Sequence, residues 1–159
     1  EDQCNYSCEE GYTLDEAATG PRDFSTSCLS NGSFSEPRSC MPVHCGPPDV
    51  PDHANLTVSA SHYPEAADFE CGRGYTLTGE VGGPTHFQRQ CQANGTYSPA
   101  PLCQPVTCGR PDAVAHADYS SQARDYRENV AYECDTGYTL DGTSTGSRQS
   151  SMTCGADAG

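Results

Sequence analysis

The sequence predicts an all-β fold in which one small, disulfide-stabilised unit is repeated in tandem. Two observations lead to this prediction: a strict cysteine register, and strand-like alternation without any sustained helical period. A constant step of 63 residues separates equivalent cysteines, with no net insertion or deletion between units. The equivalent sets are Cys8, Cys71 and Cys134; Cys28, Cys91 and Cys154; Cys40 and Cys103; and Cys45 and Cys108.

Each unit contains a stretch with the periodicity of a half-buried strand. Val130 and Tyr132 would face one side of this strand, while Ala131 and Glu133 would face the other. A Gly-Tyr-Thr-Leu sequence follows the strand in all three units, so its glycine is expected to end the strand with a bulge or a positive φ. The residues equivalent to Tyr132 are Phe69 and Tyr6, and the glycines are Gly11, Gly74 and Gly137.

Turns occupy most of the remaining chain. Asn31-Gly32 and Asn94-Gly95 stand at the same place in two units, and Asn-Gly is a strong indicator of a tight turn. Further Gly-rich and Pro-rich segments lie at residues 20–21, 82–84 and 142–146. The units are therefore expected to hold short strands joined by much irregular chain.

Composition places the chain in an oxidising compartment. Only 34% of its 159 residues are apolar, and it contains no Trp, Ile or Lys, so each unit can build only a small core. Small domains of this kind usually need covalent cross-links, which eleven regularly spaced cysteines can supply. A zinc site is not favoured, because there is no C-x2-C pair and no Cys/His cluster at ligand spacing. We expect no metal and no cofactor.

The net charge is −14, from 22 acidic residues against 8 basic ones. The acidic residues are dispersed, which indicates a solvated surface that repels nucleic acid, heparin-like polyanions and anionic lipid. No run of 18 apolar residues is present to span a membrane, and no signal peptide precedes the first unit. We expect the chain to be part of a longer protein of the secretory pathway.

Two four-residue linkers separate the units. Residues 41–44 and 104–107 each lie between two cysteines and carry Pro-Val at the same place. A short linker held by a cystine at both ends limits hinge motion, so the units are expected to form a stiff, elongated rod. The predicted domains are a module lacking its N-terminal part at residues 1–41, a complete module at 45–104, and a module lacking its C-terminal part at 108–159.

Three features of the units are typical of one family. A Cys-x-x-Pro sequence opens the unit at residues 45–48 and 108–111, and Gly-Tyr-x-Leu follows its second cysteine. A third cysteine is followed by a glycine and an aromatic residue before the closing cysteine. In these features the whole chain resembles the sushi domain, also called the complement control protein (CCP) module. That family has a core Trp where this chain has Phe34 and Tyr97, so we expect a smaller aromatic side chain in the same core position.

The resemblance implies disulfides from the first to the third and from the second to the fourth cysteine of each unit. Spacing alone allows three connectivities for four cysteines, so this pairing comes from the family. The partners of Cys28 and Cys134 stay open. The implied pairs are Cys8–Cys40, Cys45–Cys91, Cys71–Cys103 and Cys108–Cys154.

Cys4 has no equivalent in the other units. It takes the place of Ala67 and Val130, so its side chain is expected to face inward. A bridge to Cys8 is excluded, because four residues of strand span about 13 Å and a disulfide needs Cα atoms within about 7 Å. A buried free thiol, a bond to Cys28 and a bond to another chain remain as alternatives.

Four Asn-x-Ser/Thr sequences are candidate N-glycosylation sites. Asn31 and Asn94 repeat at the same expected turn, which places both at the surface. Asn5 should face solvent, because its neighbours along the strand are expected to point inward. The four candidate sites are Asn5, Asn31, Asn55 and Asn94.

No arrangement of residues supports catalysis. A nucleophile would need a nearby base and an orienting acid, and no such pattern recurs. Among the five histidines, His53 and His116 stand at the same position of their units; a turn or surface role is the simpler interpretation, and a pH-sensing contact is the alternative. The five are His44, His53, His62, His86 and His116.

The sequence favours a non-enzymatic extracellular array. One hypothesis is a structural or adhesive glycoprotein that forms a rod, filament or coat and contacts other proteins or its own neighbours. The fixed register favours it, because such a register indicates either recent duplication or an equivalent environment for every unit. The alternative is a ligand-binding array of a receptor or complement-regulator type, which the family resemblance suggests. The loops at His53 and His116 and the outward positions Glu70 and Glu133 are the candidate repeated surfaces.

Overall fold

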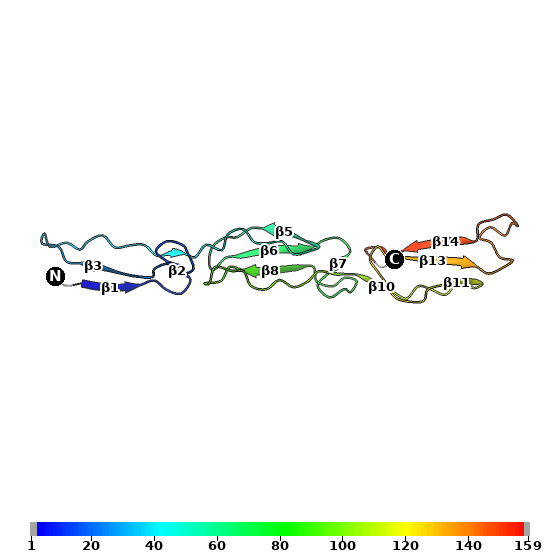
Figure 1. Cartoon of the computed structure of the whole chain (residues 1–159), viewed down its shortest axis with the longest axis horizontal. Helices are drawn as coiled ribbons and strands as arrows, with labels where there is room; N and C mark the ends of the chain where they lie inside the picture. The colour runs from blue at the N-terminus through cyan, green and yellow to red at the C-terminus, as the bar shows by residue number, and fades with distance from the viewer. Residues whose placement is uncertain (1–2, 158–159) are drawn as a thin grey trace. The chain divides into compact units, whose positions relative to one another are not determined.

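The computed structural model describes residues 3–157, which contain β-strands and no helix (Figure 1). The chain divides into two compact units. The first comprises the described residues up to Val50 together with Leu56–Glu70 and Phe87–Ala100, and the second comprises Pro51–Asn55, Cys71–His86 and the chain from Pro101 onward. The middle repeat therefore contributes to both units.

The first repeat has two short antiparallel pairs. Strand β1 (Gln3–Ser7) pairs with β3 (Asp23–Ser27), and β2 (Tyr12–Thr13) pairs with β4 (Met41–Pro42). The second pair brings the Gly-Tyr-Thr-Leu segment beside the linker.

The second repeat has the same plan with an additional strand. Strands β5 (Ala54–Val58), β6 (Ala66–Cys71) and β8 (His86–Gln90) form a sheet in the order β5-β6-β8. Strand β7 (Tyr75–Thr76) pairs with β9 (Gln104–Pro105), which again places the Gly-Tyr-Thr-Leu segment beside a linker.

The third repeat forms a sheet in the order β11-β13-β14, from β11 (Ala117–Tyr119), β13 (Asn129–Cys134) and β14 (Gln149–Thr153). Strand β10 (Thr107–Gly109) pairs with β12 (Arg124–Asp125) at the start of this repeat. The chain is thus all-β, as the sequence predicts.

The predicted alternation along the central strand is present in two repeats. In β6, Ala67 and Phe69 are fully buried and pack with Ala60, while Phe87 and Tyr97 lie against this cluster. In β13, Val130 and Tyr132 are buried, whereas Ala131 and Glu133 are exposed. The apolar face of the strand therefore builds the small core of the second and third repeats.

An aromatic pair crosses the sheet in each repeat. Phe69 stacks on Phe87 with ring centroids 5.1 Å apart, and Tyr6 stacks on Phe24 at the same distance. In the third repeat Ser150 lies opposite Tyr132, which stacks on Tyr119 instead. Such cross-strand pairs contribute roughly 0.2–1 kcal/mol each.

Two expectations about inward-facing side chains are wrong in the first repeat. All of β1 is exposed, so Cys4 does not lie in a core, and Tyr6 keeps 48% of its surface accessible. Phe34 is 65% exposed and does not fill a core position. The physical reason is coverage: in the second repeat Ala60, from the segment before the central strand, packs on Phe69, and among residues 3–157 no equivalent segment packs on β1.

Candidate functional site at the repeat junctions

The linker valine is the centre of the first junction. Val43 is 1% exposed, its N–H donates to the carbonyl of Gly11 at 2.8 Å, and its own carbonyl accepts the N–H of Tyr63 at 2.9 Å. One residue is thereby bonded to the repeat before it and to the repeat after it. The next amide, of His44, donates to the carbonyl of Glu16 at 2.8 Å.

The second junction repeats these contacts within the second compact unit. Val106 is 2% exposed, its N–H donates to Gly74 O at 2.8 Å, and its carbonyl accepts the N–H of Tyr126 at 2.8 Å. The next amide, of Thr107, donates to Gly79 O at 3.0 Å. Each residue of this set stands 63 positions after its equivalent at the first junction. Gly79, for example, corresponds to Glu16.

A tyrosine ring from the following repeat lies on the glycine of the first and of the second Gly-Tyr-Thr-Leu segment. A Cβ atom built on Gly11 would lie 2.2 Å from Tyr63 ring atoms, and one built on Gly74 would lie 2.3 Å from those of Tyr126. Both glycines also have a positive φ, of 81° and 82°. At these two positions glycine is therefore required for two reasons: the backbone conformation has a positive φ, and the tyrosine ring approaches too closely for a Cβ atom.

The next residue of the segment presents its ring edge-on to the same tyrosine. Tyr12 and Tyr63 have centroids 5.9 Å apart and an interplanar angle of 88°, and the corresponding values for Tyr75 and Tyr126 are 5.7 Å and 86°. Edge-to-face pairs of this kind contribute about 0.5–1.5 kcal/mol beyond their buried area. The combination of buried valine, glycine and two tyrosines is called the junction latch below.

Each of the two recurring histidines stacks on the tyrosine of the Gly-Tyr-Thr-Leu segment in its own repeat, and in the second repeat this tyrosine, Tyr75, belongs to the latch. His53 stacks flat on Tyr75 at 4.1 Å, and His116 stacks on Tyr138 at 4.0 Å. Both have a positive φ near 60° and remain exposed on their outer side, as expected of turn residues. The predicted repeated loops therefore lie beside the aromatic ring that each Gly-Tyr-Thr-Leu segment presents.

The two junctions differ beside the latch. His44 and His62 form an isolated bridge at the first junction, with ring centroids 4.8 Å apart, and the equivalent residues at the second are Thr107 and Asp125. The second junction also has Arg127, whose guanidinium lies 5.1 Å from the Tyr126 ring centroid. A hydrogen bond to that tyrosine raises the pKa of Arg127 above its ordinary value.

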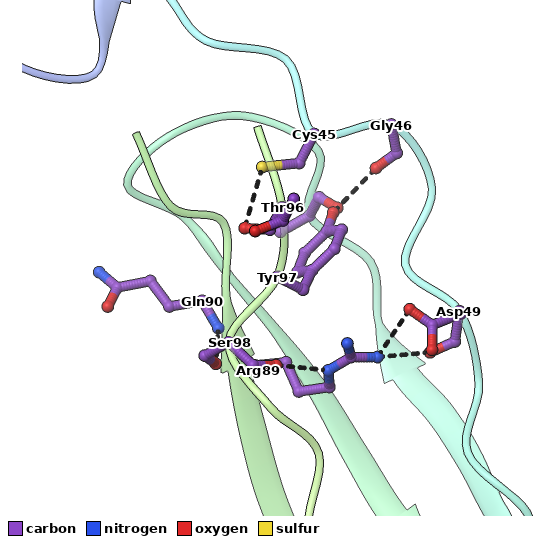
Figure 2. A network of polar contacts seen from close by, with 9 residues as sticks. Cys45, Gly46, Asp49, Arg89, Gln90, Thr96, Tyr97 and Ser98 are labelled. Atoms are coloured by element: carbon purple, nitrogen blue, oxygen red, sulfur yellow. Dashed lines mark hydrogen bonds and ion pairs between the residues drawn. The ribbon is translucent and has the colours of Figure 1, made fainter. Parts of the chain in front are cut away.

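A buried arginine organises the core of the second repeat (Figure 2). Arg89 is 7% exposed, donates from Nε to Ser98 O and from Nη1 to Asp49, and lies over the Tyr97 ring at 5.6 Å. The single O–H of Tyr97 is shared between the carbonyl oxygens of Gly46 and Ala60. Tyr97 thus occupies the expected core position.

Burial raises the pKa of Tyr97 above its ordinary value, against the opposing effect of Arg89, and Glu65 adds to the rise. The sequence interpretation missed Arg89, because its equivalents are Thr26 and Met152 and no repeated pattern marks it.

The described residues contain four disulfides, with Cα atoms 5.6–5.9 Å apart. Cys4, Cys28 and Cys134 are free thiols in this part of the chain. The four bridges join Cys8 to Cys40, Cys45 to Cys91, Cys71 to Cys103, and Cys108 to Cys154.

All four candidate glycosylation asparagines have exposed side chains: Asn5, Asn31, Asn55 and Asn94. The two in Asn-Gly turns share one geometry, in which Asn Oδ1 accepts hydrogen bonds from the backbone N–H and the hydroxyl two residues later. Their surroundings differ, because a Cβ on Gly32 would meet nothing within 4 Å, whereas one on Gly95 would lie 3.0 Å from Ala18.

Among residues 3–157 no group of three or more His, Cys, Asp or Glu side chains is placed to hold a metal ion. The same residues include no helix that is long and apolar enough to cross a membrane.

The fold agrees with a comparison to known protein families. A model of the Sushi repeat (SCR repeat) matches residues 45–103 and 108–159. The chain belongs to the sushi repeat family. This assignment agrees with the resemblance that the cysteine register and the Gly-Tyr-Thr-Leu segments indicate.

Three curated relatives align over most of this sushi chain. It is 32% identical over 144 residues to the rat (Rattus norvegicus) "Sushi, von Willebrand factor type A, EGF and pentraxin domain-containing protein 1", which covers 89% of the chain and 4% of that protein. It is 29% identical over 150 residues to mouse (Mus musculus) P-selectin, covering 88% of the chain and 18% of P-selectin. It is 28% identical over 148 residues to human (Homo sapiens) Beta-2-glycoprotein 1, and the alignment covers 87% of the chain and 39% of that protein. The chain therefore spans a minor part of each relative.

Proposed function

We propose that this chain is a non-catalytic, extracellular array of sushi repeats in which the junction latch holds consecutive repeats in a constant relation. The array would form part of a stiff rod, filament or coat. The observation that supports this proposal is the repetition of the same contacts at both junctions: a buried linker valine bonded on both sides, and a tyrosine ring seated on a glycine. The three predicted domains, at residues 1–41, 45–104 and 108–159, are the units of this proposed array.

The energetics of the latch favour a restricted hinge. Two backbone hydrogen bonds contribute about 0.5–1.5 kcal/mol each, and the edge-to-face tyrosine pair adds about 0.5–1.5 kcal/mol. A total near 3 kcal/mol corresponds to an open junction in about 1% of molecules. Because the linker valine is bonded in both directions, opening either side exposes a buried apolar side chain.

Amide hydrogen exchange tests whether the latch holds the linker. In the Tyr126→Ala variant the Val106 amide should exchange about tenfold faster than in the parent protein, while the Val43 amide is unchanged. Tyr63→Ala should have the opposite pattern. Equal exchange of both amides in all three proteins would show that the tyrosines do not hold the linkers and would contradict the proposal.

We also propose that the array contacts other proteins or neighbouring copies of itself through surfaces that recur once per repeat. The candidates are the loops at His53 and His116, which lie against tyrosine rings, and the strand positions Glu70 and Glu133. Weak contacts repeated at regular intervals add through multivalency. Chemical cross-linking of native material should join these loops to a protein, and the absence of any lateral or end-to-end protein contact would count against this role.

N-glycosylation is part of the same proposal. Asn31 and Asn94 are the favoured sites because both are exposed in the same turn, and Asn5 and Asn55 are also exposed. The name Beta-2-glycoprotein 1 describes one relative as a glycoprotein. Intact glycopeptide mass spectrometry of natively sourced protein should find glycans at Asn31 and Asn94; unmodified Asn at both sites would refute this part of the proposal.

A ligand-binding array of a receptor or complement-regulator type is the second candidate function. Its support is the similarity to P-selectin and to the rat pentraxin-domain protein named above. The complete reading frame separates the two candidates. Many further units at a step of 63 residues would favour the structural role, whereas units with variable loops and one distinctive basic or apolar patch would favour a receptor.

A further inference from the structure

The turn that carries Asn94 lies against the first repeat. A Cβ on Gly95 would lie 3.0 Å from the Cβ of Ala18 and 3.7 Å from Val43 Cγ1. Asn94 itself lines a groove of about 270 Å³, together with side chains of the first repeat and of the linker. Any group attached to Asn94 therefore begins at the first junction.

The Asn94 side chain is arranged for attachment at its nitrogen. Its Oδ1 accepts hydrogen bonds from the Thr96 N–H at 3.0 Å and from Thr96 Oγ1 at 2.8 Å. These bonds orient the amide and leave Nδ2, the atom that carries an N-glycan, without a partner among the described residues. The side chain is exposed, so a glycan can be accommodated.

One residue that lines the groove has a buried polar atom without a partner among the described residues. Thr13 is 2% exposed and lines the groove, and its Oγ1 makes no hydrogen bond to any described residue. The equivalent Thr76 donates its hydroxyl to the carbonyl of Glu80 at 3.2 Å. A buried hydroxyl without a partner is costly, by about 1–3 kcal/mol, and a ligand hydroxyl would remove this cost.

We propose that the first sugar of a glycan on Asn94 lies in this groove and covers the first junction. The inference rests on the proposed glycosylation of Asn94. A sugar presents several hydroxyls, which suit Glu10 and Arg22 at the groove wall and, after a small rotation of the side chain, Thr13 Oγ1. Because the sugar is tethered at the rim, its effective concentration at the groove is about millimolar or higher, so weak contacts suffice.

Asn31 supplies a matched control within the same chain. Its turn has the same sequence pattern and the same hydrogen bonds, but Gly32 has no atom within 4 Å of its Cβ position. A glycan on Asn31 would therefore lack, at its turn, a contact equivalent to that between Gly95 and Ala18. Thr96→Ala and Ser33→Ala each remove one acceptor sequence and keep its asparagine.

The experiment measures exchange of the Val43 and His44 amides in protein secreted from eukaryotic cells. Both amides bond to the first repeat beneath the groove, so loss of the Asn94 glycan in Thr96→Ala should accelerate their exchange about five- to tenfold. Ser33→Ala should leave their exchange unchanged. The same variants are then compared in refolded, unglycosylated protein, where Thr96→Ala should have no effect on these two amides.

Each other result overturns the inference in a recognisable way. If mass spectrometry finds Asn94 unmodified, both the glycosylation proposal at this site and the inference fail. If Asn94 is glycosylated but Thr96→Ala does not change the exchange of the two amides, the glycosylation proposal is retained and the proposed position of the sugar in the groove is wrong. If Thr96→Ala accelerates exchange equally in unglycosylated protein, the effect belongs to the turn and not to the sugar.

Discussion

At the scale of single residues, Gly74 carries two constraints that substitution can separate. Its φ of 82° disfavours any other residue, and the Tyr126 ring occupies the space that a Cβ would need. Gly137 has only the first constraint, since its φ is 91° and nothing lies within 4 Å of its Cβ position. The backbone term for a non-glycine residue is about 1–2 kcal/mol.

We predict that Gly74→Ala lowers the free energy of unfolding by about 3 kcal/mol, of which about half is the backbone term and the rest the displaced ring. In a Tyr126→Ala background the same substitution should cost only about 1–2 kcal/mol, because no ring is displaced. Denaturant unfolding with intact disulfides measures all four proteins of this double-mutant cycle.

Gly137→Ala is the reference for this cycle and should also cost about 1–2 kcal/mol. Additive effects of Gly74→Ala and Tyr126→Ala would mean that the ring does not press on the glycine, and would contradict the described latch.

Tyr97 should make the free energy of unfolding depend on pH in the alkaline range. Burial raises its pKa in the folded state above the ordinary value, which is about 10 in an unfolded chain. The folded protein therefore binds the Tyr97 proton more tightly, so the contribution of Tyr97 to stability is complete below pH 10 and is lost as pH rises through the raised pKa. The hydroxyl bonds to Gly46 and Ala60 are the structural source of that contribution.

Tyr97→Phe should accordingly cost about 1–3 kcal/mol at pH 8, because the carbonyls of Gly46 and Ala60 lose the hydroxyl donor that they share. The difference in stability between the parent and the variant should shrink above pH 10. Denaturant unfolding at several pH values, with free thiols alkylated to prevent disulfide exchange, measures this difference. A constant difference from pH 8 to pH 11 would show that Tyr97 does not titrate with folding.

At the scale of elements, the periodicity of the sequence correctly predicted those features of the strands that depend only on neighbouring residues. The alternation of β13 and the Gly-containing end of the strand are properties of a few consecutive residues, and both are present. The same reasoning was wrong for Cys4, because burial needs a second segment to cover the strand as well as an apolar face. The expectation that Phe34 fills a core position came from the family resemblance and was also wrong. Arg89 was missed because it occurs once, so the repeat comparison gave no indication of it.

Disulfide connectivity belongs to this scale as well. Spacing left three possibilities per four cysteines, and the family resemblance selected one of them. Peptide mapping of unreduced protein should recover Cys45–Cys91 and Cys71–Cys103 from the second repeat. Recovery of Cys45–Cys71, which joins neighbouring cysteines in the sequence, would be incompatible with both the family assignment and the described bridges.

At the scale of the whole molecule, the junction latch is the feature that sequence reasoning least anticipated. Tyr63 and Gly11 lie 52 residues apart in different repeats, and no local pattern connects them. The available indication was the recurrence of the pair as Tyr126 and Gly74 at the 63-residue step. Short Pro-Val linkers predicted restricted motion, and the structure adds specific contacts that can restrict it.

Residual dipolar couplings of the backbone amides in weakly aligned protein test most directly whether these latches hold the repeats in a constant relation. The account predicts that amides of all three repeats fit alignment tensors of equal magnitude, because rigidly joined repeats share one alignment. It also predicts that Tyr126→Ala reduces the tensor magnitude of one repeat beside the second junction relative to its neighbour. Tensors of clearly different magnitude in the parent protein would mean that the repeats move independently, and would contradict the account.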